Sequence, residues 1–96
     1  MHTWIMYDIV NDRARTRIAK YCKQAGLYRV QYSVFLGTIS AEEKDVLELQ
    51  IAQEIDEETD KVYIFPMGPS AMRQTVCLGQ ALDKKLVTDQ IKALFF

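Results

Sequence analysis

The feature that most constrains this chain is the apolar run at its start, from Thr3 to Val10, which carries a single carboxylate. Six of its eight residues are apolar or aromatic, a composition that predicts a β-strand buried on both faces at the centre of a sheet. An ionised side chain in such a strand is costly unless it is paired, hydrogen-bonded or bound to a cation. Asp8 therefore needs a partner. Three arginines follow it closely, at positions 13, 15 and 17, and together these residues predict a site for a metal ion and a phosphodiester.

A helix is predicted directly after this strand. Asn11 or Asp12 can cap its start, and Gly26 is a plausible residue to end it. Its apolar positions recur with a period near 3.6: Ala14, Ile18, Cys22 and Ala25. The spacing places basic residues together on one face, namely Arg13, Arg17 and Lys20. Both a polyanion-binding face and an ordinary solvated surface are compatible with this pattern.

The middle of the chain predicts more strands and a second helix. Residues 27–39 are rich in β-formers but long for one strand, so they form either one bent strand or two strands joined at Tyr32 and Ser33. Ser40 and Glu43 have the spacing of a capping box, and the helix that they open has a buried stripe at Leu47, Ile51 and Ile55 with Ala52 beside it. Residues 62–65 predict a last buried strand ended by Pro66. This order predicts an α+β fold of the ferredoxin-like βαββαβ kind.

The end of the chain is too apolar to be disordered. Residues 75–78 predict a short edge strand, and residues 81–96 form a tail that is rich in large apolar side chains: Leu82, Leu86, Val87, Ile91, Leu94, Phe95 and Phe96. Such a tail must dock on a surface, and a second copy of the chain or a partner protein is a good candidate.

Length and composition favour one domain, residues 1–96, without a secretory signal or a membrane span, so we expect a cytoplasmic protein. Cys22 and Cys77 lie far apart and His2 is the only histidine. Neither a zinc site nor a disulfide framework is therefore indicated, and both cysteines are expected to be buried.

The overall charge of −1 hides a strong division along the chain. Between Asn11 and Arg29 there are six basic residues and one acidic residue, whereas residues 40–60 contain nine acids and one lysine. We expect a basic face that binds polyanions and an acidic face that does not.

The sequence resembles the Cas2 family of small CRISPR-associated endonucleases. The residues that carry the resemblance are Tyr7-Asp8-Ile9, the spaced run Asp12, Arg15 and Arg17, the segment from Arg29 to Gly37, Phe65-Pro66, and Gly79. The resemblance implies a ferredoxin-like homodimer whose fifth strand lies against the partner's sheet. It also implies a scaffolding role, in which the dimer bridges two dimers of the larger CRISPR integrase and holds a spacer duplex.

The resemblance further implies metal-dependent cleavage of RNA or duplex DNA in some members, with Asp8 as the catalytic and metal-binding residue. The cofactor would be Mg²⁺, with Mn²⁺ as an alternative. In the family, the residues that match Tyr7, Arg15, Arg17, Arg29 and Phe35 lie around that site. We therefore expect the site to be lined by Tyr7, Ser33 and Phe35, and nucleic acid to be bound by Arg13, Arg15, Arg17, Lys20 and Arg29. Where the family often has Ser or Thr two residues after the aspartate, this chain has Val10, which removes a hydroxyl ligand.

The chemistry of these residue types agrees with such a site. Magnesium commonly takes one or two carboxylates, so Asp8 needs a second carboxylate from a symmetry mate. Guanidinium groups engage two phosphate oxygens at once and position a duplex without reading its sequence. Alternatively, Asp8 is a turn carboxylate bonded to backbone amides. Tyr7 and Phe35 stack on a base or, as we favour, fill the dimer interface.

Two function classes therefore remain open. In the first, the chain is a bridging module of a nucleoprotein complex, for which the arginines matter and Asp8 is dispensable. In the second, it is a metal-dependent nuclease, with a ribonuclease toxin of the VapD type as the alternative identity, and Asp8 is essential. The gene neighbourhood would separate them, because an integrase gene and a repeat array favour the first and an antitoxin gene favours the toxin.

Overall fold

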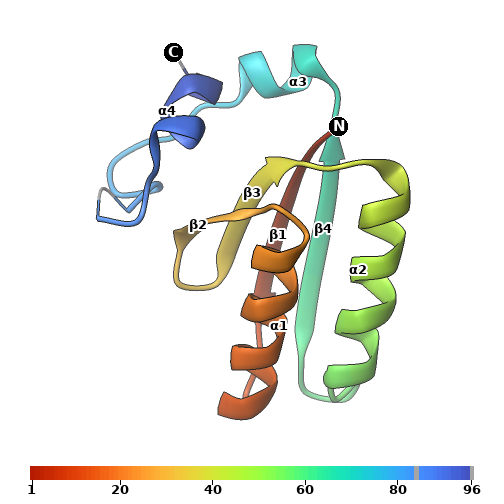
Figure 1. The fold of residues 1–96 in the computed structure, drawn as a ribbon. Helices are drawn as coiled ribbons and strands as arrows, with labels where there is room; N and C mark the ends of the chain where they lie inside the picture. The colour runs from red at the N-terminus through yellow and green to blue at the C-terminus, as the bar shows by residue number, and fades with distance from the viewer. Residues whose placement is uncertain (84, 96) are drawn as a thin grey trace.

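The predicted βαββαβ order is confirmed, and two short helices follow the last strand (Figure 1). The computed structural model describes residues 1–83 and 85–95, and all of their side chains except those of residues 90, 94 and 95. The elements are β1 (His2–Asp8), α1 (Asp12–Gln24), β2 (Tyr28–Gln31), β3 (Val34–Thr38), α2 (Ala41–Glu54), β4 (Lys61–Met67), α3 (Pro69–Gln74) and α4 (Asp89–Phe95).

The strands form one antiparallel sheet in the order β2-β3-β1-β4, so β1 is central, as its composition predicts. The long segment of residues 27–39 is resolved as two strands joined by a turn at Tyr32 and Ser33. The pairing of β2 with β3 shifts between Arg29 and Gln31. A bulge of this kind bends a strand and increases its twist.

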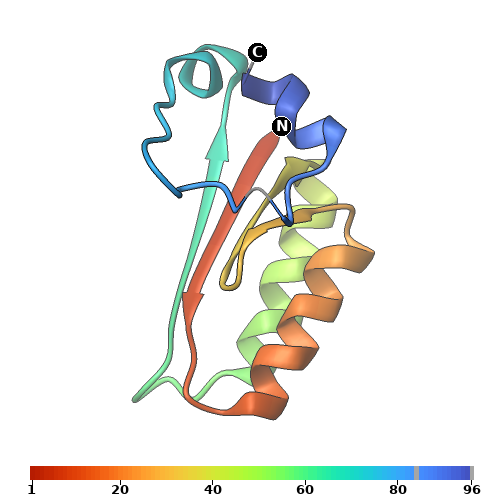
Figure 2. The same cartoon turned by 90° about the vertical axis from the view of Figure 1, so that its left-hand side faces the viewer.

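The two faces of the sheet are covered by different parts of the chain. Because side chains alternate along a strand, the register places Ile5, Tyr7, Phe35, Val62 and Ile64 on one face, which α1 and α2 cover and which we call the helix face. The other face of the sheet, which we call the open face, carries Trp4, Met6, Val34, Leu36, Tyr63 and Phe65. Figure 2 shows the two long helices on one side of the sheet and the segment after α3 crossing the other.

The local signals around α1 act as predicted. The Asn11 side chain accepts a hydrogen bond of 2.9 Å from the Ala14 amide, which satisfies one of the free N–H groups of the first turn. After the C-cap Ala25, Gly26 has a φ of 101°, a conformation that side chains other than glycine rarely adopt. The helix therefore begins and ends where the sequence indicates.

The second helix also has its predicted start, but its buried stripe is narrower. Ser40 and Glu43 form the reciprocal capping box, and Leu47 and Ile51 are buried, whereas Ala52 is exposed. The two long helices lie side by side on the helix face (Figure 1). The basic and acidic stretches are therefore neighbours in one layer, and not opposite faces of the molecule.

The last strand predicted at residues 62–65 is present, but it is neither buried on both faces nor ended by Pro66. β4 runs through this proline to Met67, and it is an edge strand with Tyr63 and Phe65 exposed at 53% and 42%. An edge strand tolerates proline because half of its N–H groups face away from the neighbouring strand.

The predicted edge strand at residues 75–78 is absent from the described part of the chain. These residues follow α3 without regular structure, and Val76 and Leu78 are 75% and 79% exposed. The reason is that a strand forms only where a free edge accepts its hydrogen bonds, and this segment crosses the open face without pairing.

The tail docks on its own sheet, so the expected docking on a second copy or a partner protein is wrong for the part described. Ile91 of α4 is fully buried against Trp4, Val30 and Leu36 of the open face and against Met72 of α3. The amide of Asp83 donates to the Val30 carbonyl at 2.7 Å. The Gln31 side chain also donates to two carbonyls of the tail, those of Gln80 and Ala81. The Leu94 and Phe95 side chains and Phe96 lie outside the described residues.

Two further expectations concern the cysteines and membrane spans. Both thiols are free, with Cys22 fully buried and Cys77 half-buried. Within the described residues, no helix has the length and apolar character needed to cross a membrane.

Candidate functional site

Asp8 is the last residue of β1, and its side chain is exposed. The register places it on the open face, directly across from Lys61 of β4. Because the carboxylate is solvated, the cost of burial that the sequence predicts does not arise. No hydrogen bond or ion pair of this carboxylate exists within residues 1–83 and 85–95, so the alternative of a turn carboxylate held by backbone amides is wrong.

The residues around Asp8 in one chain do not by themselves fit a magnesium ion. No group of three His, Cys, Asp or Glu side chains that could hold a metal occurs in the part of the chain that the structure describes. The cross-strand neighbour, Lys61, brings a positive charge instead of a second ligand. A second carboxylate from another molecule is therefore needed to make the donor set that magnesium prefers.

The expected lining residues Tyr7 and Phe35 lie on the helix face, away from Asp8. Their rings stack at 6.4 Å between centroids, and they are 7% and 0% exposed. The Arg29 guanidinium lies over the Phe35 ring at 5.1 Å, which compensates in part for its buried Nε, whose hydrogen-bond partner is missing among the described residues. Base stacking and interface filling are both excluded for two rings that are core residues.

Burial and the nearby guanidinium act in opposite directions on the Tyr7 hydroxyl. Burial raises the pKa of Tyr7, and Arg29 beside it lowers that pKa in part. Ser33 contributes a backbone carbonyl, which accepts a hydrogen bond of 3.1 Å from the Tyr7 amide. These residues hold the end of β1 against the turn between β2 and β3, which is a structural role.

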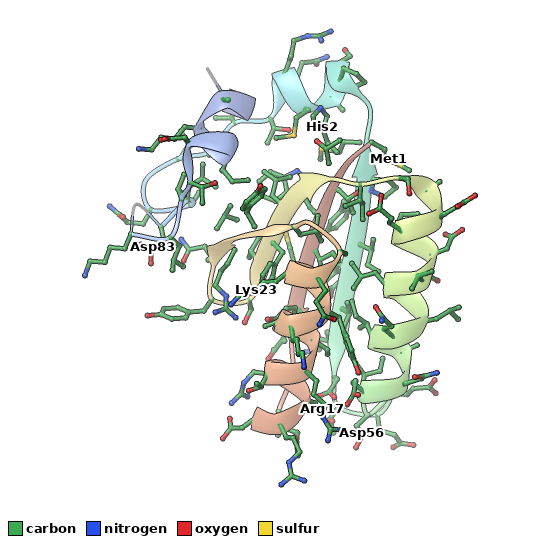
Figure 3. The ribbon with its side chains drawn as sticks, in the orientation of Figure 1. Met1, His2, Arg17, Lys23, Asp56 and Asp83 are labelled. Atoms are coloured by element: carbon green, nitrogen blue, oxygen red, sulfur yellow. The ribbon has the colours of Figure 1, made fainter. Side chains whose placement is uncertain are left out.

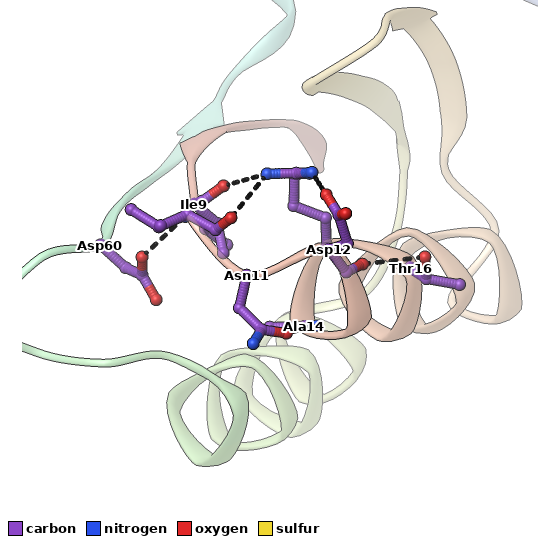
Figure 4. A network of polar contacts seen from close by, with 8 residues as sticks. Ile9, Asn11, Asp12, Ala14, Thr16 and Asp60 are labelled. Carbon is purple, nitrogen blue, oxygen red and sulfur yellow. Dashed lines mark hydrogen bonds and ion pairs between the residues drawn. The ribbon is translucent and has the colours of Figure 1, made fainter.

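Arg15 locks the loop between β1 and α1 (Figure 4). Its Nη1 donates to the carbonyls of Ile9 and Val10, at 2.7 and 3.0 Å, and its Nη2 pairs with Asp12. These carbonyls accept no backbone bond within a helix or strand, so the guanidinium satisfies groups that the chain reversal leaves free. Arg15 is consequently committed to the fold and has little capacity left for phosphate.

The other basic side chains of α1 differ in how free they are. Arg17 pairs with Glu54 at the end of α2 at 3.2 Å, and the Tyr21 hydroxyl donates to the same carboxylate at 3.2 Å. Figure 3 shows Arg17 between the two helices, near Asp56. Arg13, Lys20 and Lys23 are exposed and form no ion pair within the described residues, so they are the available cations of this helix.

Asp60 has a structural role in this region that the sequence does not reveal. Its carboxylate accepts from the amide of Val10 at 3.1 Å and from the amide of Asp56 at 2.8 Å. These hydrogen bonds lower the pKa of Asp60 below its ordinary value. The carboxylate thus ties the loop before α1 to the loop before β4, and a shallow hollow of about 590 Å³ opens beside it, with Arg13 and Arg17 on its wall. Nothing in the local sequence links positions 10 and 60, because only the pairing of β1 with β4 brings them together.

Comparison with known proteins places this geometry in a family. The family model described as CRISPR associated protein Cas2 matches residues 1–75. A CRISPR-associated endoribonuclease Cas2 of Chloroflexus aurantiacus is 40% identical over 83 residues, which are 86% of this chain and 98% of that protein. One of Archaeoglobus fulgidus is 36% identical over 63 residues, 66% of this chain and 67% of that protein.

The fold is shared as well as the sequence. The crystal structure of Streptococcus pyogenes Cas2 superposes with a TM-score of 0.70 at 28% identity, covering 82% of this chain and 100% of that chain. This likeness confirms the ferredoxin-like arrangement that the sequence predicts, with four antiparallel strands and two covering helices. From its sequence motifs, its sheet topology and these matches, the chain belongs to the Cas2 family of CRISPR-associated proteins.

Proposed function

We propose that this chain is the bridging component of a spacer-acquisition complex: a homodimer that binds duplex DNA through α1 and joins copies of the larger CRISPR integrase. The observation that carries the proposal is the separation of charges in the fold. The available cations Arg13, Lys20 and Lys23 lie on α1 in the helix layer, whereas Asp8 lies on the open face of the sheet. The groups that would hold a duplex on α1 are therefore not the candidate catalytic carboxylate, which lies on the other side of the sheet.

The open face supports the homodimer. Tyr63 and Phe65 stack on each other at 6.2 Å and remain largely exposed. Beside them an apolar groove of about 400 Å³ runs between the sheet and the segment after α3, with Trp4, Met6 and Val34 in its lining. Large exposed aromatic side chains next to an apolar groove are typical of protein interfaces.

A nuclease activity is the second candidate. The carboxylate of Asp8 favours it, because it is exposed and has no partner among residues 1–83 and 85–95. Two copies packed through their open faces would bring two such carboxylates to one interface, where like charges repel and a divalent cation is favoured. The pair would hold Mg²⁺ or Mn²⁺, which when bound polarises a phosphate and lowers the pKa of a water. The relatives from Chloroflexus aurantiacus and Archaeoglobus fulgidus are named endoribonucleases, so RNA is the first substrate to test.

The binding proposal is tested by removing two of the available cations. Arg13→Gln with Lys20→Gln should lower duplex affinity for all sequences alike and reduce the dependence of affinity on salt, because fewer counterions are released. Lys85→Gln with Lys92→Gln is the matched control, since both lysines are exposed and lie in the tail. Fluorescence anisotropy over a salt series measures both. Equal losses in the two variants would reject α1 as the binding face.

The nuclease proposal is tested at Asp8. Asp8→Asn keeps the shape of the side chain and removes its charge, so metal-dependent cleavage of single-stranded RNA or duplex DNA should disappear while duplex binding persists. Asp89→Asn, on α4, is the matched control. Cleavage that survives chelator, or that equals wild type in Asp8→Asn, comes from a contaminating nuclease and rejects Asp8. If the wild-type protein cleaves nothing with either metal, the nuclease proposal is rejected and only the bridging role remains.

A further inference from the structure

A second groove, unrelated to Asp8, lies between the end of α1 and the start of α2. It has a volume of about 360 Å³, and Ala25, Glu42, Val46 and Gln50 are among its lining residues. Val46 is 55% exposed, and Leu49, one helical turn further on, is 66% exposed. Residues three apart on a helix are neighbours on its surface. The outward side of α2 thus presents two adjacent aliphatic side chains, of which Val46 lines the groove and Leu49 lies next to Val46.

The charge around these aliphatic side chains is negative and is only partly neutralised within the chain. Lys44 pairs with Asp45 and Glu48, at 3.2 and 3.8 Å. The Glu43 carboxylate is used by the capping box, and its pKa is lowered by the Ser40 backbone amide and hydroxyl. Glu42 has no ion pair within the described residues and is exposed beside Val46. The surface combines apolar contact area with unmatched carboxylate charge.

We propose that this groove is a docking site for a basic, amphipathic helical segment of a partner protein. Aliphatic side chains of that segment would cover Val46 and Leu49, and its lysines or arginines would face Glu42 and the neighbouring carboxylates. Charge complementarity of this kind speeds association and fixes orientation. The inference goes beyond the proposed function, because it assigns protein recognition to α2 and does not require duplex binding or cleavage.

Two other occupants are less suitable on chemical grounds. Nucleic acid would place phosphates against carboxylates, and like charges repel. A second copy offers basic residues on α1, but none of the large apolar side chains exposed in the described chain belongs to α1. A pairing of α2 with α1 of another copy would leave Val46 and Leu49 uncovered.

The test uses the full chain and a designed helical peptide with leucines on one face and lysines on the other. The amide signals of labelled protein, followed by NMR during titration, should shift along residues 42–50 and at the end of α1. An isosteric peptide with glutamate in place of lysine should not bind. Shifts concentrated instead at residues 56–60 would indicate nonspecific attraction to acidic loops and overturn the proposal.

Variants separate the apolar contribution from charge. Val46→Ala with Leu49→Ala should weaken peptide binding at least fivefold, without loss of the fold, because both side chains are exposed and alanine favours helix. Glu42→Gln should weaken it about threefold, whereas Glu57→Gln, an equal charge change outside the groove, should change it less than 1.5-fold. Unchanged peptide affinity in the alanine variant, or equal effects of Glu42→Gln and Glu57→Gln, would reject the docking site. Either result would mean that the outward side of α2 is an ordinary solvated acidic surface. Duplex affinity of the alanine variant should equal wild type, so the two proposals fail independently.

Discussion

At the scale of single residues, Asp60 shows how one carboxylate can fix a site without touching a ligand. It accepts two backbone hydrogen bonds from segments that are far apart in sequence, and it is used by the fold in its ionised form. A group whose pKa is lower in the folded state stabilises the protein above its unfolded pKa and loses that effect as the pH falls through the folded pKa. The pKa of Asp60 is lowered from its ordinary value of 3.8. The stabilisation by Asp60 is therefore present at neutral pH and is lost only at acidic pH, below this value.

Asp60→Asn is therefore expected to lower the thermal midpoint at neutral pH, because the two backbone bonds go to different carboxylate oxygens and the NH₂ group of an amide cannot accept the second one. The difference from wild type should shrink as the pH falls below the ordinary value of 3.8. Calorimetry from pH 7 to pH 2 measures it, with Asp89→Asn as the exposed control. A difference that stays constant over the whole range would contradict the assigned role of the charge.

Cys22 provides a second residue-scale prediction. Burial raises the pKa of this thiol to about 12, and the thiolate is the reactive form. We expect a thiol reagent at pH 8 to modify the half-buried Cys77 first and to reach Cys22 only on unfolding. Peptide mapping after timed labelling gives the order, and rapid labelling of Cys22 in native protein would contradict its burial.

At the scale of elements, the loop between β1 and α1 and the tail are the two segments held by a few specific contacts. The loop depends on Arg15, whose guanidinium bonds two carbonyls. The tail depends on Ile91 and on hydrogen bonds to β2. Segments with few contacts open locally before the whole domain unfolds.

Ile91→Ala should release the tail, because truncating a buried isoleucine costs about 2–5 kcal/mol. Amide exchange of residues 80–95 should accelerate strongly while exchange in β1 changes little. Leu78→Ala is the control, since Leu78 is 79% exposed and its loss should leave the exchange rates unaltered. Uniform acceleration throughout the chain would mean that the tail is part of the cooperative core.

At the scale of the whole molecule, the sheet is covered fully on one side and only in part on the other. The helix face is closed by α1 and α2, whereas the tail covers the open face around Trp4, Val30 and Leu36 and leaves the aromatic side chains of β4 exposed. This asymmetry leaves the uncovered part of the open face as the surface for the second copy in the homodimer that we propose.

We therefore expect light scattering to give about twice the chain mass of 11.1 kDa at micromolar concentration. Tyr63→Ser with Phe65→Ser should give a monomer, because the exposed aromatic pair would no longer be available for burial. Leu49→Ser, on the helix layer, should remain dimeric. A monomeric wild type, or a dimer that tolerates the serine variant, would reject this interface and with it the paired Asp8 carboxylates.

Local sequence signals determined the elements from β1 to β4 but not the two short helices after them. The helix caps at Asn11 and Ser40, the glycine at position 26 and the apolar period of α1 act within a few residues of one another, so they can be read along the chain. The central place of β1 followed from its composition. These signals, with the motifs around Tyr7 and Arg29, were also sufficient to indicate the Cas2 family.

Only the tertiary structure decided which residues share a surface. The strand register separated Asp8 from Tyr7 and Phe35, because consecutive side chains of a strand point to opposite faces. The packing of α1 on α2 paired Arg17 with Glu54. The chain reversal after β1 left backbone carbonyls free, and Arg15 donates hydrogen bonds to them. The tail packs on the sheet of its own chain because the open face carries apolar side chains that the tail can cover. Each of these outcomes depends on where the chain returns in space, and hydrophobic pattern alone does not specify it, since burial of apolar surface is not directional.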